Sequence, residues 1–159
     1  MPDGECTGKM LFLVSIVIAT IKYLELMFYI MCGYIVPMDC SEPFHEVTEP
    51  GTIVTSPNYP NEYQNNKDCG TKIRFPPGER VVLEVQDFNV EHHSACVWDY
   101  VEVKDGDNAN SSRIEPKLCG SAIPRPIISS GNTLFIRFKT DDEMTHSGFK
   151  MKVDRRKLE

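Results

Sequence analysis

The sequence predicts an all-β protein, a two-sheet antiparallel β-sandwich that follows an apolar N-terminal segment. From Cys40 onward the chain consists of short runs in which apolar and polar residues alternate, and Pro, Gly and Asn separate these runs. An alternation with a period of two is typical of half-buried strands. No run has the 3.6-residue period of a long helix. Many short strands at close spacing favour a sandwich.

The first 38 residues differ from the rest of the chain. Residues 10–21 form an apolar run that is too short to span a bilayer but suits the hydrophobic region of a signal peptide. Cleavage after Ala19 would leave a second apolar stretch at the new terminus, and Lys22 and Glu25 would each cost a membrane anchor about 2.5 to 3.5 kcal/mol. Three interpretations of residues 1–38 stay open: a signal peptide, a signal anchor or an artefactual exon.

The polar region, residues 40–153, contains the predicted strands. A strand over residues 51–56 ends at Ser56-Pro-Asn-Tyr-Pro, where two prolines remove backbone donors. Residues 71–75 and 80–85 both alternate, and the Pro76-Pro-Gly break between them predicts a hairpin-like pair. Two further strands have alternating patterns, over residues 134–139 and 149–153, and residues 154–159 form a basic C-terminal tail.

The stretch from residue 91 to residue 103 combines a strand pattern with an acid on the wrong face. Val97, Asp99, Val101 and Val103 share one parity, so the valines predict a core-facing side and Asp99 falls on it. A carboxylate there does not stay ionised alone, because burial favours its neutral form. Asp99 therefore needs a wet rim, a hydrogen-bond donor or a bound cation.

Cysteine spacing and charge limit the class of protein. Four cysteines lie in the polar region with no C-x-x-C spacing of a zinc site, which predicts two disulfides and a secreted or extracellular location; they are Cys40, Cys69, Cys96 and Cys119. Neither Cys6 nor Cys32 receives a role. The net charge of -6 argues against nucleic acid and suits a cationic partner. Asn110-Ser-Ser is an N-glycosylation sequon in a polar loop.

No motif predicts an active site. His45-Glu46 lacks the second histidine of a zinc-protease helix, no G-x-S-x-G occurs, and the cysteines of the polar region are used in disulfides. His92 and His93 point to opposite faces of an extended segment and have no third ligand at a suitable spacing, so we interpret them as an exposed loop. The chain is predicted not to be an enzyme, although it fits a non-catalytic fragment of a secreted protease.

Residues 40–153 resemble a CUB domain, the extracellular module of complement proteases, tolloid-like proteases and spermadhesins. The resemblance depends on elements in a fixed order: Cys40, Gly51-Thr-Ile, Ser56-Pro-Asn-Tyr-Pro, Tyr63, Cys69, Cys96-Val-Trp-Asp-Tyr-Val-Glu-Val, Asp105-Gly106, Leu118-Cys119-Gly120, Phe138-Lys-Thr-Asp141 and Ser147-Gly148-Phe149. It implies a jelly-roll type sandwich with Cys40 bonded to Cys69 and Cys96 bonded to Cys119, whereas spacing alone permits three pairings. The chain departs from many relatives at Thr71 and Trp98, where they carry an aromatic residue and a tyrosine.

The resemblance also implies a calcium site. The acids of the calcium-binding subset of the family fall on Glu91, Asp99 and Asp141, and Tyr63 matches a position that hydrogen-bonds the glutamate. Three carboxylates supply part of the six to eight oxygens that Ca²⁺ prefers, and carbonyls of residues 142–144 and waters would complete the shell.

The function that this implies is protein recognition. The carboxylates of a calcium-fixed site would receive a lysine or arginine of an extracellular partner protein. The alternative is a calcium-free, spermadhesin-like secreted protein that binds glycans or coats gametes, in which the acids only line a solvated rim.

Overall fold

The computed structural model describes residues 34–41 and 43–158. The chain divides into two units, residues 1–34 and residues 35–159, and nearly all the described residues belong to the second. Residues 1–33 of the N-terminal segment, with Cys6 and Cys32, lie outside the described part, and so do the three interpretations of that stretch. Within the described residues, no helix is long and apolar enough to cross a membrane.

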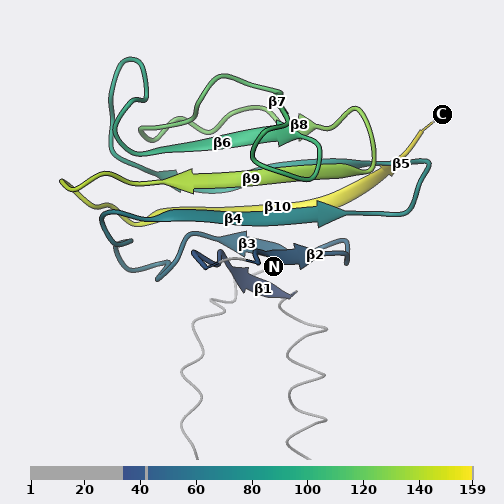
Figure 1. Cartoon of the computed structure of the whole chain (residues 1–159), viewed down its shortest axis with the longest axis horizontal. Helices are drawn as coiled ribbons and strands as arrows, with labels where there is room; N and C mark the ends of the chain where they lie inside the picture. The colour runs from purple at the N-terminus through teal and green to yellow at the C-terminus, as the bar shows by residue number, and fades with distance from the viewer. Residues whose placement is uncertain (1–33, 42, 159) are drawn as a thin grey trace, which may run out of the picture. The chain divides into compact units, whose positions relative to one another are not determined.

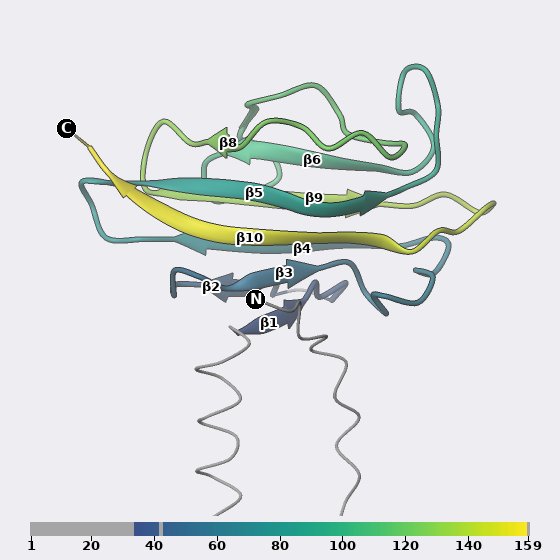
Figure 2. The same ribbon diagram turned by 180° about the vertical axis from the view of Figure 1, so that it is seen from behind.

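The second unit is a sandwich of two five-stranded sheets, which Figures 1 and 2 show from opposite sides. The first sheet has the order β1-β3-β10-β5-β8. Its strands are β1 (Ile35–Pro37), β3 (Ile53–Thr55), β10 (Gly148–Lys157), β5 (Glu79–Asn89) and β8 (Ile127–Ile128). The second sheet has the order β2-β4-β9-β6-β7. Its strands are β2 (His45–Val47), β4 (Asp68–Arg74), β9 (Thr133–Lys139), β6 (Tyr100–Asp105) and β7 (Ser112–Arg113).

The core lies between the sheets and is built from the alternate residues of the long central strands. Its large, fully buried side chains include Leu83, Leu134, Ile136, Phe138, Phe149 and Met151. Phe138 of β9 meets Phe149 of β10 edge to face with ring centroids 5.2 Å apart, so aromatic packing joins the two sheets. The predicted all-β sandwich is thus confirmed.

Two features of strand pairing differ from the sequence predictions. Each sheet is mixed, because β1 pairs parallel with β3 and β2 pairs parallel with β4, while the longer strands pair antiparallel. The predicted hairpin of residues 71–75 with residues 80–85 is wrong: β4 pairs with β9 in one sheet, and β5 pairs with β10 in the other. The Pro76-Pro-Gly segment carries the chain from one sheet to the other. The two prolines have no backbone N–H to donate, but no inter-strand hydrogen bond is needed at this crossing.

The ends of the sandwich also differ from the predicted boundaries. Residues 35–37, assigned from the sequence to the apolar segment, form strand β1, and Met38 is part of the core. At the other end, β10 continues to Lys157, because the basic tail pairs with the start of β5 from Glu79 onward. The backbone ladder holds these charged residues in a strand while their side chains stay in water.

Candidate metal centre

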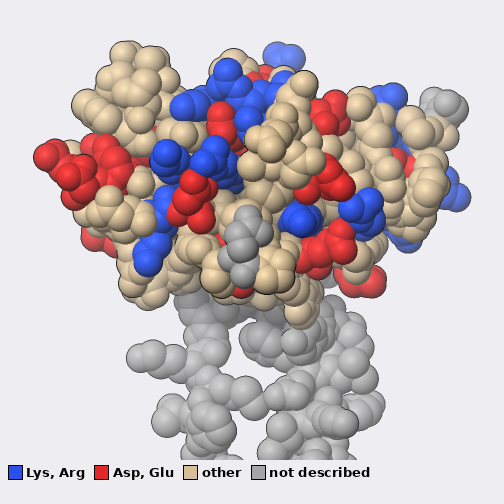
Figure 3. Space-filling view, viewed as in Figure 1, with Lys and Arg blue, Asp and Glu red and all other residues tan. Residues whose placement is uncertain are grey.

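Three acidic side chains meet at one end of the sandwich. Asp99 immediately precedes β6, and Asp141 lies two residues beyond β9. These strands pair antiparallel with Tyr100 opposite Lys139, so the start of one lies beside the end of the other. Glu91 lies two residues beyond the end of β5, and β5 belongs to the facing sheet. Figure 3 shows acidic side chains gathered at the end where the β9–β10 loop lies.

The three carboxylates are close together and sheltered from water. Each offers one oxygen, and these oxygens lie within 4.8 Å of one another. Asp99 is 0% exposed and Glu91 is 6% exposed, while Asp141 is half-buried. Like charges repel more strongly when water is excluded. The arrangement therefore favours either a bound cation or protonated carboxyls.

Hydrogen bonds satisfy only some of the carboxylate oxygens. Asp99 Oδ1 accepts the backbone N–H of Asp141 at 2.8 Å, and Asp141 Oδ1 accepts the backbone N–H of Glu143 at 3.0 Å. Within the described part of the chain, Glu91 Oε2 and Asp99 Oδ2 are buried without any hydrogen-bond partner. Buried oxygens that are left unsatisfied cost free energy unless a ligand uses them.

Tyr63 connects the acids to the core. Its hydroxyl accepts the backbone N–H of Glu91 at 3.1 Å, and its ring packs edge to face on Phe138 with centroids 5.0 Å apart. The contact of Tyr63 with the glutamate position is therefore made to the backbone of Glu91. Burial raises the pKa of the tyrosine most, and the neighbouring Asp99 carboxylate raises it further, so the hydroxyl stays protonated.

Electrostatics at the site favour the neutral forms of two acids. Burial raises the pKa of Asp99 most, while the Tyr63 hydroxyl and the Asp141 N–H lower it in part. Burial also raises the pKa of Glu91, and the charges of Asp99 and Asp141 raise it further. His146 lowers the pKa of both carboxyls through its charge. No sequence motif indicates a role for His146.

The donor set fits a hard divalent cation. All three side chains offer carboxylate oxygens, two oxygens are buried without a partner, and the three acids come from separate loops that a shared ligand would join. Ca²⁺ prefers such oxygens, and backbone carbonyls or waters commonly complete its shell. Transition metals such as Zn²⁺ favour nitrogen and sulfur ligands, so this set suits Ca²⁺ better.

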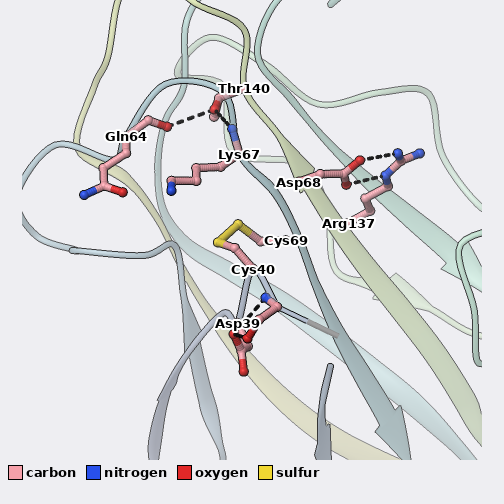
Figure 4. Close-up of a disulfide and its surroundings, with 9 residues drawn as sticks. Asp39, Cys40, Gln64, Lys67, Asp68, Cys69, Arg137 and Thr140 are labelled. Carbon is pink, nitrogen blue, oxygen red and sulfur yellow. Dashed lines mark hydrogen bonds and ion pairs between the residues drawn. A yellow bond between two sulfur atoms is a disulfide. The ribbon is translucent and has the colours of Figure 1, made fainter. Parts of the chain in front are cut away.

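A neighbouring loop braces the loop that carries Asp141. The Thr140 hydroxyl donates to the Gln64 carbonyl at 2.9 Å and accepts the backbone N–H of Lys67 at 2.9 Å, as Figure 4 shows. The Asn65 side chain donates to the carbonyl of Asp142 at 3.0 Å. No local sequence pattern marks these contacts, because the partners are more than 70 residues apart in the chain.

Two disulfides hold the segments around the site. Cys96–Cys119 ties the loop between Glu91 and Asp99 to the segment that follows β7, and Cys40–Cys69 joins the N-terminal part of the sandwich to β4 (Figure 4). These are the pairs that the family resemblance implies. Disulfides of this span stabilise by about 3 to 4 kcal/mol in the chain-entropy model.

The segment after Cys96 departs from the predicted strand. Val97 was placed on the core face with Val101 and Val103, but Val97 is 56% exposed and β6 begins only at Tyr100. Cys96 has a positive φ of 45° and lies in the disulfide, which diverts the chain before the strand starts. The prediction for Val97 is wrong, whereas Val101 and Val103 are buried as predicted.

Other predicted residues lie outside the acidic cluster. His92 is exposed and His93 is half-buried, with its ring 4.3 Å from that of Trp98. Trp98 is itself 45% exposed, which explains why an indole is tolerated there. Asn110 is exposed in the loop between β6 and β7, and its glycosylation stays a prediction.

Two disulfides, two stacked sheets and loops that converge on a cluster of acids define an extracellular β-sandwich module. The family model of the CUB domain matches residues 40–153. The chain therefore belongs to the CUB domain family. The domains of this family are non-catalytic modules for protein–protein interaction.

Relatives place this module in larger extracellular proteins. The chain is 37% identical to human Tolloid-like protein 1 over 111 residues, which are 70% of this chain and 11% of that protein. It is 42% identical to Blastula protease 10 of Paracentrotus lividus over 112 residues, 70% of this chain and 18% of the relative. It is 39% identical to canine Cubilin over 109 residues, 68% of this chain and 3% of that protein. The chain thus spans less than a fifth of each of these relatives.

Solved structures agree with the fold. The CUB2 domain of MASP-1 bound to Ca²⁺ has a TM-score of 0.63 and 29% identity, and the match covers 72% of this chain and 99% of that domain. The full extracellular region of zebrafish Gpr126/Adgrg6 has a TM-score of 0.64 and 29% identity, covering 71% of this chain and 14% of that region. The predicted secreted or extracellular location is confirmed by these relatives.

Proposed function

We propose that this CUB domain binds calcium through Glu91, Asp99 and Asp141 and uses the resulting site to bind a basic side chain of a partner protein. The single observation that supports it most is the convergence of three carboxylate oxygens within 4.8 Å, two of the acids being buried. Without a cation, repulsion between the buried carboxylates destabilises the fold, whereas a bound Ca²⁺ would neutralise this repulsion and use the carboxylates as ligands. The calcium-bound MASP-1 domain, which shares the fold, supports the choice of ion.

Each acid has a distinct part in the proposed site. Asp99 is fixed at the start of β6 and takes the Asp141 N–H on one oxygen, which leaves Oδ2 for the ion. Glu91 contributes Oε2 from the facing sheet. Asp141 belongs to the more exposed β9–β10 loop, so it has room to share its carboxylate between the ion and a partner. When bound, Ca²⁺ supplies the positive charge that holds these three loops together.

The partner in this proposal is an extracellular protein that exposes a lysine or arginine. The chain carries a net charge of -6, and Asp142 and Glu143 add exposed acids beside Asp141. An acidic rim attracts a basic partner, and a carboxylate held in place by calcium can accept its N–H donors. Because the relatives are long proteins that include proteases, we place the module as a non-catalytic part of a secreted protease or another mosaic protein.

Calcium titration of the purified chain tests the first step. In calcium at about 100 times Kd, binding should add about 2.7 kcal/mol to the free energy of unfolding and raise Tm relative to EDTA. Asp141→Asn should abolish this increment, whereas Glu143→Gln, which changes an exposed acid in the same loop, should keep it. A Tm that millimolar calcium leaves unchanged would exclude the calcium site.

The second step is tested with a defined probe. A peptide with one lysine and its glutamine counterpart are compared for binding in calcium and in EDTA. We expect the lysine peptide to bind more tightly in calcium, and Asp141→Asn to remove the preference. Calcium binding without this preference would refute only the recognition step. The absence of both, with binding to a glycan array, would support the calcium-free, glycan-binding alternative.

A further inference from the structure

The outer face of the second sheet, which has the strand order β2-β4-β9-β6-β7, contains a hollow away from the acidic cluster. It measures about 230 Å³ and combines aromatic, charged and small residues, namely Phe44, Asp68, Ala109, Asn110, Phe135 and Arg137. Phe135 and Arg137 project outward from β9, because Leu134, Ile136 and Phe138 occupy the alternate, core-facing positions. The proposed calcium-dependent function uses none of these six side chains.

The floor of the hollow consists of two aromatic rings on a glycine. Gly70 of β4 has no side chain, and a Cβ there would lie 2.7 Å from ring atoms of both Phe44 and Phe135. The two rings are 5.8 Å apart between centroids and tilted by 52°. They therefore lie directly on the bare backbone of the sheet. Any larger residue at position 70 would displace these rings.

The wall of the hollow is polar. Arg137 Nε donates to Asp68 Oδ1 at 2.7 Å, and a second bond joins its Nη2 to Asp68 Oδ2, as Figure 4 shows. The ion pair stays accessible, because the side chains of Arg137 and Asp68 are 28% and 46% exposed. The planar ion pair offers hydrogen-bond donors and acceptors for the hydroxyl groups of a ligand, and the aromatic rings beside it offer an apolar surface. A sugar ring has a matching combination of surfaces, because its C–H groups form an apolar face and its hydroxyl groups form a polar edge.

Asn110 lies at the edge of this hollow. It is exposed and starts the sequon Asn110-Ser-Ser, and its backbone N–H donates to Asn108 Oδ1 at 2.9 Å, which fixes the loop. Among the described residues, no group forms a hydrogen bond with the side-chain amide of Asn110. The one atom that N-glycosylation modifies is thus available beside a surface that suits carbohydrate.

We propose that Asn110 carries an N-linked glycan whose innermost sugar packs into this hollow, with its apolar face on Phe44 and its polar edge toward Asp68 and Arg137. The attachment requires a lipid diphosphate-linked oligosaccharide as donor. The amide nitrogen of Asn110 forms a bond to the sugar C1, the C1–O bond to the diphosphate breaks, and the amide loses one proton to a base. The tether then makes docking intramolecular, so a weak contact suffices for high occupancy.

The chain itself offers matched variants for the test. Ser112→Ala removes the sequon but keeps Asn110 and the lining of the hollow. Asn110→Ser destroys this sequon and creates Asn108-Ala-Ser, which moves the glycan by two residues in the same loop. Phe44→Leu keeps an apolar cover over Gly70 but removes the aromatic face. The parent and all variants are expressed from the full coding sequence in a glycosylating eukaryotic cell.

Intact mass gives the occupancy, and calorimetry gives the effect of the glycan. The glycosylated chain should melt about 3 °C or more above Ser112→Ala, the shift expected for one aromatic contact in a domain of this size. In the Phe44→Leu background, Ser112→Ala should change Tm by less than about a third of that amount. In NMR spectra, the N-acetyl methyl of the inner sugar should shift upfield in the parent and return toward the free-sugar position in Phe44→Leu.

Three results would overturn the proposal. A chain without a glycan at Asn110 excludes the modification itself. A glycan with free-sugar resonances and no effect on Tm is attached but not docked. Equal protection by the glycan moved to Asn108 shows a general effect of glycosylation rather than packing in the hollow.

Discussion

The backbone N–H of Asp141 donates to the side chain of Asp99 at 2.8 Å, so one acid of the cluster holds the loop that carries another. This bond uses Oδ1 of Asp99 and leaves Oδ2 buried without a partner in the described part of the chain. The fold thus positions two acids against each other before any ligand is present. The free energy cost of this arrangement gives a direct prediction for the metal-free protein.

Replacing Asp99 with asparagine should stabilise the metal-free domain while removing calcium binding. In Asp99→Asn, the amide oxygen of the new side chain can still accept the Asp141 N–H, and an uncharged NH₂ group replaces the buried Oδ2, which has no hydrogen-bond partner in the described part of the chain. Loss of a buried charge should raise the free energy of unfolding in EDTA by about 1 kcal/mol. Urea unfolding in EDTA and in calcium measures both effects. A variant that is less stable than the parent in EDTA would show that the charge is already compensated.

The pH dependence of the metal-free domain should follow the raised pKa values of Glu91 and Asp99. Because their folded-state pKa values exceed the ordinary values of 4.5 and 3.8, the folded protein binds protons more tightly than the unfolded chain. Their contribution to stability is fully present below the unfolded pKa values and is lost as pH rises through the folded values. The contribution of these two groups should therefore lower Tm in EDTA as pH rises from about 4 to neutral.

Other acids change Tm with pH in the opposite direction, so the pH dependence of the parent has to be compared with that of a reference variant. Asp68 has its pKa lowered by Arg137, and its contribution is lost as pH falls. The difference in Tm between the parent and Asp99→Asn cancels such groups. In EDTA this difference should grow in favour of Asp99→Asn as pH rises. The stabilisation of the parent by calcium should also grow with pH, because protons compete for the same oxygens. A calcium effect that is larger at about pH 5 than at about pH 7 would contradict the site.

Removing the Tyr63 hydroxyl should destabilise the domain at the cluster while keeping its core intact. Tyr63→Phe leaves the Glu91 N–H without its acceptor but keeps the ring that packs on Phe138. We expect a loss of about 1 to 2 kcal/mol in urea unfolding. Tyr59→Phe is the control, since the Tyr59 hydroxyl bonds the exposed Asp87 and should contribute less than about 0.5 kcal/mol. Equal losses in the two variants would refute the special role of Tyr63.

Local periodicity predicted the strands and placed Asp99 on the core-facing side of one of them, because parity is a property of a single segment. Asp99 shares its parity with Val101 and Val103, and all three are buried. Periodicity does not specify partners, however. Strands β4 and β5 looked like a hairpin because Pro76-Pro-Gly breaks a chain equally well inside a sheet and between sheets.

The composition of the cluster was predictable only through family resemblance. The residue pattern alone showed that Asp99 needed a partner, but Glu91 and Asp141 follow other strands. The bracing contacts of Thr140 with Gln64 and Lys67 depend on loops that meet only in the folded chain. Val97 failed because the turn at Cys96 interrupts the strand, and alternation carries no signal of such a turn.

Two buried threonines should respond in opposite ways to the same substitution. Thr71 lies on the core face of β4 beside Ile73, and within the described residues its hydroxyl has no hydrogen-bond partner. Thr71→Val keeps the shape of the side chain and removes the unsatisfied hydroxyl, so it should raise the free energy of unfolding by about 1 kcal/mol.

Thr140→Val is the matched counterpart. The Thr140 hydroxyl makes two hydrogen bonds, to the Gln64 carbonyl and from the Lys67 N–H, and both are lost in the variant. We expect Thr140→Val to lower the free energy of unfolding by about 1 to 3 kcal/mol and to weaken calcium binding, because the loop of Asp141 loses its brace. Urea unfolding of both variants under one condition gives the comparison. A destabilising Thr71→Val would mean that a water or an alternative rotamer already satisfies that hydroxyl.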